Sequence, residues 1–138
     1  MPKEDLVPMH PIGPEALVAV EVEDRVVVIR RSPIPHSAQS LTAAYQWAIA
    51  RAVERANTEA LAPGLILDVR AAPGRNDPDF ENELVDLHRQ IEARFDPIVT
   101  LMRTSVGVLQ ATRLARQLGI SDLIVQDHAD AIALCQAR

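Results

Sequence analysis

Arginines and carboxylates gather where apolar runs of this chain give way to polar loops. Asp68 and Arg70 end one such run, and Arg75 and Asp77 lie in the loop that follows it. Two other runs end in arginine, one at Arg30 and Arg31 and one at Arg103. Guanidinium groups beside the free N–H groups of helix N-termini are the chemistry of an anion site. A strand-end arginine also pairs readily with a nearby carboxylate. The pattern therefore indicates either an anion-binding rim or a set of internal ion pairs.

The spacing of the residues gives little support for metal binding, triad catalysis or nucleotide binding. The four histidines lack the spacing of metal ligands, and Asp68 has no serine and histidine partners in the order of a catalytic triad. The loop at Gly74 matches no nucleotide-binding motif. Cys135, the only cysteine, excludes an internal disulfide and is expected to be a packed thiol in the last helix. An enzyme built on Asp68, His36 and the arginines is the least favoured of the alternatives, so we expect no enzyme, no metal and no cofactor.

Composition narrows the class of protein. A chain of 138 residues, 48% of them hydrophobic, is long enough to bury the core of a single domain. The net charge of −5 argues against a nucleic-acid partner, because neutralising phosphates requires a basic face. No secretion signal and no apolar run of the ~20 residues that a membrane helix needs is present, so we expect a cytoplasmic protein without a membrane span.

The elements that must position these residues alternate along the chain. Prolines predict a flexible arm over residues 1–15, and residues 16–138 are predicted to form one domain. Strands are predicted at 16–22, 26–31, 65–70, 98–103 and 123–125. Helices are predicted at about 37–60, 77–95, 104–118 and from 127 onward. A short polar break between the first two strands predicts a hairpin, and single helices between the others predict right-handed crossovers. The fold class is therefore α/β: a mostly parallel sheet of about five strands that opens with a hairpin, with four crossover or terminal helices.

Helix ends and core positions follow from local chemistry. Caps are predicted at Ser37 or Ser40, Asp77 (followed by Pro78), Thr104 or Ser105, and Asp127, with Gly119 closing the third helix. Apolar residues recur at helical spacing after Asp77 and should cover the sheet over the middle strand. The expected core here is Leu67, Val69, Phe80, Leu84, Leu87 and Ile91.

This order resembles the STAS domain, the fold of bacterial anti-sigma-factor antagonists, over residues 16–137. The most specific piece is Leu67-Asp68-Val69 followed, after a loop, by a helix that begins at Asp77. Those antagonists typically show Asp-Leu-Ser at the strand end and Asp-Ser-Ser-Gly at the helix start, where a serine is phosphorylated. The architecture is also similar to the related CRAL/TRIO lipid-binding fold.

The chain departs from the STAS pattern at the helix start. Pro78 and Asp79 stand where the family shows its serine pair, and the spacing from Asp68 to Asp77 is one residue longer. We therefore expect no serine phosphoswitch here. The Asp79 carboxylate either imitates a permanent negative charge or is ordinary chemistry of a helix N-terminus.

A second surface is indicated by Trp47. A helical wheel places it opposite the apolar stripe of its helix, beside Ala43 and Ala50. Such an aromatic residue indicates either an interface, including that of a homodimer, or a single tryptophan covered by long neighbouring side chains.

The resemblance implies a regulatory protein–protein interaction module whose partner is a kinase or another signalling protein. The expected rim comprises Asp68, Arg70, Arg75, Asn76, Asp77, Asp79, Arg103 and Ser105. The alternative is a domain that binds a small molecule, lipid or anion at the same rim. A flat charged rim without a cavity would favour the first function, and an apolar groove beneath the first long helix would favour the second.

Overall fold

The computed structural model describes residues 13–34, 37–72, 78–120 and 123–137, with the backbone alone for residues 38 and 78–83. Its elements are α1 (Pro14–Leu17), β1 (Val18–Glu23), β2 (Val26–Arg31), α2 (Ala38–Thr58), β3 (Leu65–Asp68), α3 (Pro78–Glu92), β4 (Ile98–Leu101), α4 (Ser105–Leu118), β5 (Leu123–Val125) and α5 (His128–Gln136). The sheet has the order β1-β2-β3-β4-β5; β1 and β2 are antiparallel and the other neighbours are parallel. The predicted α/β fold class is confirmed.

The opening hairpin turns on two residues. Asp24 and Arg25 both have positive φ angles, 49° and 67°, which is the backbone of a type I′ turn and matches the twist of the two strands. The Arg25 guanidinium donates to the carbonyl oxygen of Ala60 at 3.0 Å and so connects the turn to the segment that follows α2. The polar break in the sequence therefore forms the predicted hairpin.

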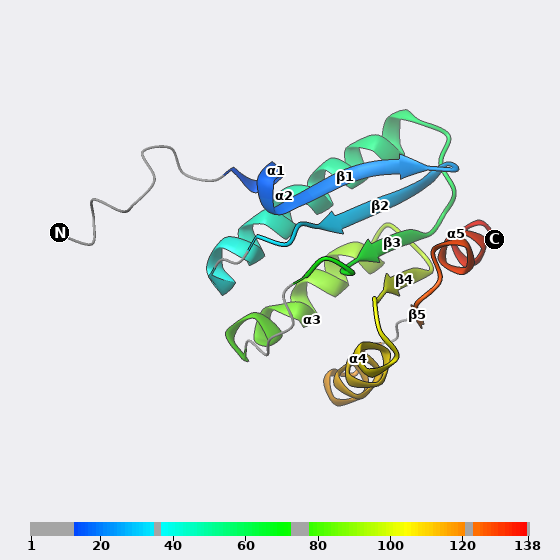
Figure 1. Ribbon diagram of the computed structural model, residues 1–138. Helices are drawn as coiled ribbons and strands as arrows, with labels where there is room; N and C mark the ends of the chain where they lie inside the picture. Colours follow the sequence, from blue (N-terminus) through cyan, green and yellow to red (C-terminus); the bar gives the residue numbers. More distant parts are fainter. Residues whose placement is uncertain (1–12, 35–36, 73–77, 121–122, 138) are drawn as a thin grey trace.

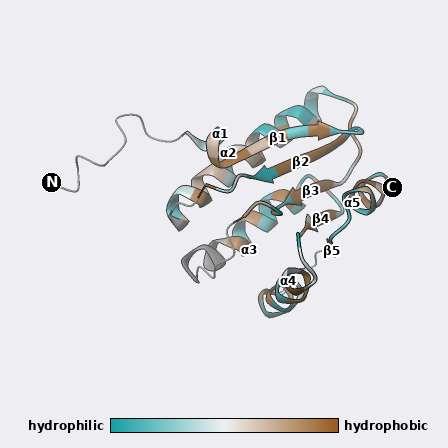
Figure 2. Cartoon of the chain, in the orientation of Figure 1, coloured by the Kyte–Doolittle hydropathy of each residue, from teal (hydrophilic) through white to brown (hydrophobic). Residues whose placement is uncertain are grey.

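Helices cover both faces of the sheet (Figure 1). On one face, Val27, Ile29 and Leu65 pack against α2 and α3. On the other, Val28 and Ile66 pack against α5. Alternate side chains of a strand point to opposite faces, so β2 and β3 must be apolar on both. Figure 2 shows that the central strands are hydrophobic along most of their length and that β2 becomes hydrophilic at its carboxyl end.

Small residues bring helices close to the sheet. The buried stripe of α2 includes Ala44, Ala48 and Ala52, whose short side chains allow close packing. On the opposite face, a Cβ added at Gly64 would lie 2.7 Å from both Cα and Cβ of Cys135. Residue 64 is therefore a glycine because α5 passes directly over the start of β3.

The predicted helix caps are largely confirmed. The side chains of Ser37, Thr104 and Asp127 accept backbone N–H groups at the starts of α2, α4 and α5. Gly119 ends α4 with a φ angle of 69°, the left-handed conformation that favours glycine. Asp77, the predicted cap of α3, lies outside the described residues.

Two predictions need correction. Residues 14 and 15, assigned to the arm, begin the short helix α1, which packs against α2 and buries Leu17. In the predicted core, Leu87 and Ile91 are buried, but Leu67, Val69 and Leu84 are only half-buried. Those three residues line a cavity, so part of their surface meets no packed neighbour. The side chain of Phe80 lies outside the described part of the chain.

Candidate functional site at the carboxyl edge of the sheet

Asp68, at the end of β3, accepts hydrogen bonds from two arginines. Its Oδ1 accepts from the backbone N–H of Arg70 at 3.1 Å and from Arg70 Nε at 3.0 Å. Its Oδ2 accepts from Arg70 Nη2 at 2.8 Å and from Arg30 Nε at 2.9 Å. Strand register produces this arrangement, because Arg30 and Asp68 are direct partners in the parallel pairing of β2 and β3. The carboxylate is buried, with a relative exposure of 2%.

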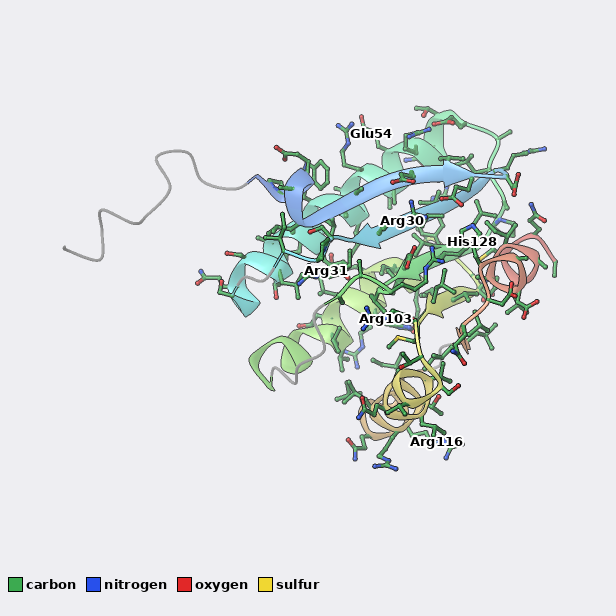
Figure 3. The ribbon with its side chains drawn as sticks, viewed as in Figure 1. Arg30, Arg31, Glu54, Arg103, Arg116 and His128 are labelled. Carbon is green, nitrogen blue, oxygen red and sulfur yellow. The ribbon has the colours of Figure 1, made fainter. Side chains whose placement is uncertain are left out.

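Arg30 extends these contacts to β1 and α5. Its Nη1 donates to Glu21 Oε2 at 2.6 Å and its Nη2 to Glu23 Oε1 at 2.7 Å. The other oxygen of Glu23 lies 2.6 Å from His128 Nε2 at the start of α5. Figure 3 labels Arg30 on β2 and His128 on α5. These residues and Asp68 form a polar network, which joins β1, β2, β3 and α5.

The network determines what Asp68 can do chemically. Burial alone would raise the pKa of this carboxyl group, but hydrogen bonds from the side chains of Arg70 and Arg30 outweigh it and lower the pKa to about 2. The hydrogen bond from Arg30 likewise lowers the pKa of Glu23. Asp68 is therefore ionised at neutral pH and is a weak proton acceptor. For Arg30 and Arg70, this geometry supports internal ion pairs with Asp68 rather than an anion-binding rim.

Arg103 has different surroundings. It is exposed in the turn between β4 and α4, where its carbonyl oxygen accepts from Gln126 Nε2 at 3.4 Å. Ser105 donates its hydroxyl to Gln126 Oε1 at 3.0 Å. The guanidinium of Arg103 makes no ion pair with any described residue. Of the predicted rim, Asp68 and Arg70 thus come together, whereas Arg103 and Ser105 belong to the start of α4.

The remaining predicted rim residues are not described. Arg75, Asn76 and Asp77 lie outside the described residues, as does the side chain of Asp79. The predicted anion site at the start of α3 therefore stays a prediction.

The exposed face of α4 was not predicted as a site. Val106 and Leu109 have relative exposures of 62% and 67%, and Arg113 and Arg116 continue the same stripe at spacings of three and four. Figure 3 shows Arg116 on the side of α4 that faces away from the sheet. Residues 97–121 contain three arginines and no carboxylate, although the whole chain carries a net charge of −5. This local excess of positive charge is the sequence signal that could have indicated a surface on α4.

Trp47 is not the outward-facing aromatic residue that the helical wheel predicts. It is partly buried and packs against the hydrophobic core on the α2 side of the sheet, although Ala43 and Ala50 are exposed as expected. The guanidinium carbon of Arg51 lies 5.9 Å from the centroid of the indole ring. The long side chain of Arg51 therefore covers part of the ring. This matches the second interpretation of Trp47, a tryptophan covered by neighbouring side chains rather than an interface residue.

A cavity of about 250 Å³ separates α4 from the sheet and from α3. Of the lining residues, Tyr45 alone belongs to α2, and most of the others belong to α3, α4 and the sheet. The cavity therefore lies under α3 and α4 rather than beneath α2. Its lining is Tyr45, Leu67, Val69, Leu84, Leu87, His88, Ile91, Thr100, Met102, Ala111, Leu114, Ala115, Leu118, Ile120 and Ile124. This face of the sheet is therefore not free of cavities.

In the described ranges, no group of three or more histidine, cysteine or acidic residues could hold a metal ion. None of the helices described here combines the length and the apolar character needed to cross a bilayer. No protein-family model, curated protein or solved structure matches this chain.

Proposed function

We propose that this chain is a STAS-type regulatory module and that it binds a protein partner through the exposed stripe of α4. The stripe comprises Val106, Leu109, Arg113 and Arg116, and Arg103 lies in the turn just before the helix. The observation that carries the proposal is that Val106 and Leu109 are both exposed on α4. The charged residues of this helix, Arg113 and Arg116, are both positive. The partner is a protein surface with an apolar patch surrounded by carboxylates.

Exposed apolar side chains in the middle of the stripe supply a nucleus for binding. Single exposed leucines are common on protein surfaces, but two neighbouring apolar residues bordered by arginines match the usual composition of an interface centre and rim. Val106 and Leu109 are three residues apart, so they lie on the same side of α4. Arg113 and Arg116 extend the stripe along the helix.

Charge favours an acidic partner. Arg103, Arg113 and Arg116 make no ion pair with any residue that the structure describes, so they are available to carboxylates of another protein. Arg30 and Arg70, by contrast, are held by Asp68. Complementary charge accelerates association and weakens with added salt.

The STAS assignment rests on the resemblance and on the topology. A hairpin followed by parallel strands and single crossover helices is consistent with it. Because Pro78 and Asp79 stand where the family shows its serine pair, we expect no serine phosphorylation at the start of α3 to control partner binding on α4.

The test compares two charge reversals at exposed arginines. Proteins captured from the source cell by the wild-type chain are identified, purified and titrated calorimetrically against the variants. Arg113→Glu should weaken binding by about 30-fold, the effect of a ~2 kcal/mol interface residue. The matched control Arg89→Glu, on the exposed side of α3, should bind as the wild type does.

The second variant tests the apolar part of the stripe. Leu109→Glu should also weaken binding by about 30-fold, whereas Leu123→Glu, at another exposed leucine, should not. Unchanged affinity in both Arg113→Glu and Leu109→Glu would refute the proposal. Light scattering on the wild-type protein should show a monomer. If it shows a dimer that Leu109→Glu dissociates, the stripe binds a second copy of this chain, which would contradict the proposal of an acidic partner.

A further inference from the structure

The inner face of α4 is apolar and incompletely packed. Ala111, Leu114, Ala115 and Leu118 line the cavity, and α4 has no fully buried residue among those described. On the other side of the cavity, Leu87 and Ile91 of α3 are almost completely buried. The cavity therefore removes contacts from α4 more than from α3.

The volume is large for a packing defect. Protein interiors are close-packed and seldom contain voids larger than a water molecule. Engineered apolar cavities of ~150 Å³ remain dry and bind benzene. This cavity holds about 250 Å³ and opens to solvent, so a molecule can enter it without unfolding the domain.

The lining excludes charged ligands. It contains no lysine, arginine, aspartate or glutamate, and its titratable residues are Tyr45 and His88. Burial raises the pKa of Tyr45 to about 12, so the phenol is neutral. His88 Nδ1 lies 2.5 Å from Glu92 Oε1 on the next turn of α3. Any charge on His88 is thus already paired with Glu92, so a ligand charge would lose its hydration without gaining an unpaired opposite charge.

We propose that the cavity between α3, α4 and the sheet binds a small, uncharged, hydrophobic molecule, about the size of one or two aromatic rings. Binding adds the contacts that α4 lacks and buries the apolar lining. The site lies on the inner face of α4, separate from the stripe on its outer face and from the strand-end arginines, so it goes beyond partner binding.

The first test uses a matched pair of probes. The wild-type protein, labelled with ¹⁵N, is titrated with 1-naphthol and, separately, with the 1-naphthoate anion. We expect saturable shifts with naphthol at the amides of cavity residues such as Leu67, Leu87 and Leu114, and at least tenfold weaker binding of naphthoate. Equal affinity for both probes, or shifts scattered over the surface without saturation, would overturn the proposal.

The second test fills the cavity. Ala111→Phe places a ring inside it and should reduce naphthol affinity at least tenfold. If that variant does not fold, Ala115→Leu fills less of the space and should show a smaller loss. Ala133→Phe, at an exposed alanine of α5, is the control and should bind as the wild type does. A folded cavity variant with wild-type affinity would place the probe elsewhere and contradict the assignment.

Discussion

Replacing Asp68 with asparagine should destabilise the fold through the polar network. The carboxylate accepts four hydrogen bonds, two at each oxygen. An asparagine keeps one acceptor oxygen, and its NH₂ group would face the donors of Arg30 or Arg70. The substitution thus removes the negative charge and places the amide N–H donors of asparagine against the guanidinium donors of the arginines.

The magnitude follows from the pKa of Asp68. A folded-state pKa of about 2 against an ordinary value of 3.8 corresponds to about 2 kcal/mol at neutral pH. Breaking a fully buried ion pair costs about 3–5 kcal/mol, but Arg30 and Arg70 are partly exposed and can turn toward water. We therefore expect Asp68→Asn to lower the free energy of unfolding by about 2–3 kcal/mol.

The pH dependence has a definite sign. Because folding depresses the pKa of Asp68, its contribution is fully present above the unfolded pKa near 4 and is lost as the pH falls toward 2. The difference in stability between wild type and Asp68→Asn should therefore be constant above about pH 5 and should shrink below pH 4.

Urea denaturation at pH 7, 4 and 2.5, followed by circular dichroism, measures this difference. With a slope of about 2 kcal/mol per molar urea, the midpoint at pH 7 should fall by about 1–1.5 M. Glu59→Gln is the control: it breaks the exposed pair with Arg55 and should not move the midpoint measurably. An unchanged midpoint in Asp68→Asn, or a difference of equal size at pH 2.5, would refute the stabilising role of the network.

Three further outcomes are expected. Gly64→Ala should lower the free energy of unfolding by about 1–3 kcal/mol in urea titrations, because the added Cβ would lie 2.7 Å from backbone and Cβ atoms of Cys135; a neutral effect would mean that α5 yields easily. The Cys135 thiol should react with iodoacetamide only as fast as the protein opens, since burial raises its pKa to about 12; rapid alkylation of the native protein would contradict its packing. Leu87→Ala should cost about 2–5 kcal/mol by the same urea assay, and a loss below 1 kcal/mol would show that the core beneath α3 is not packed as described.

Much of the fold was predictable because its signals are local. The type I′ hairpin, the caps at Ser37, Thr104 and Asp127, and the end of α4 at Gly119 each depend on a few adjacent residues. The helix α1 was missed because prolines usually indicate a loop, yet a proline is well tolerated in the first turn of a helix.

The features of the candidate site depend on tertiary spacing. The contact of Arg30 with Asp68 follows from strand register, which the sequence does not specify for residues 38 positions apart. The cavity depends on how far α4 stands from α3 and the sheet, for which no local pattern exists. The partial burial of Trp47 was missed because a helical wheel gives the direction of Cβ and not the reach of a large ring.

The partner surface is tested most directly by crosslinking in the source cell. A photoreactive p-benzoylphenylalanine is placed at position 109 on the outer face of α4 and, in a second protein, at position 43 beside Trp47. We expect position 109 to crosslink to one acidic protein, the yield to fall sharply when Arg113 and Arg116 are changed to glutamate, and position 43 to give no product. A specific product at position 43 with none at position 109 would contradict the proposal and move the interface to α2.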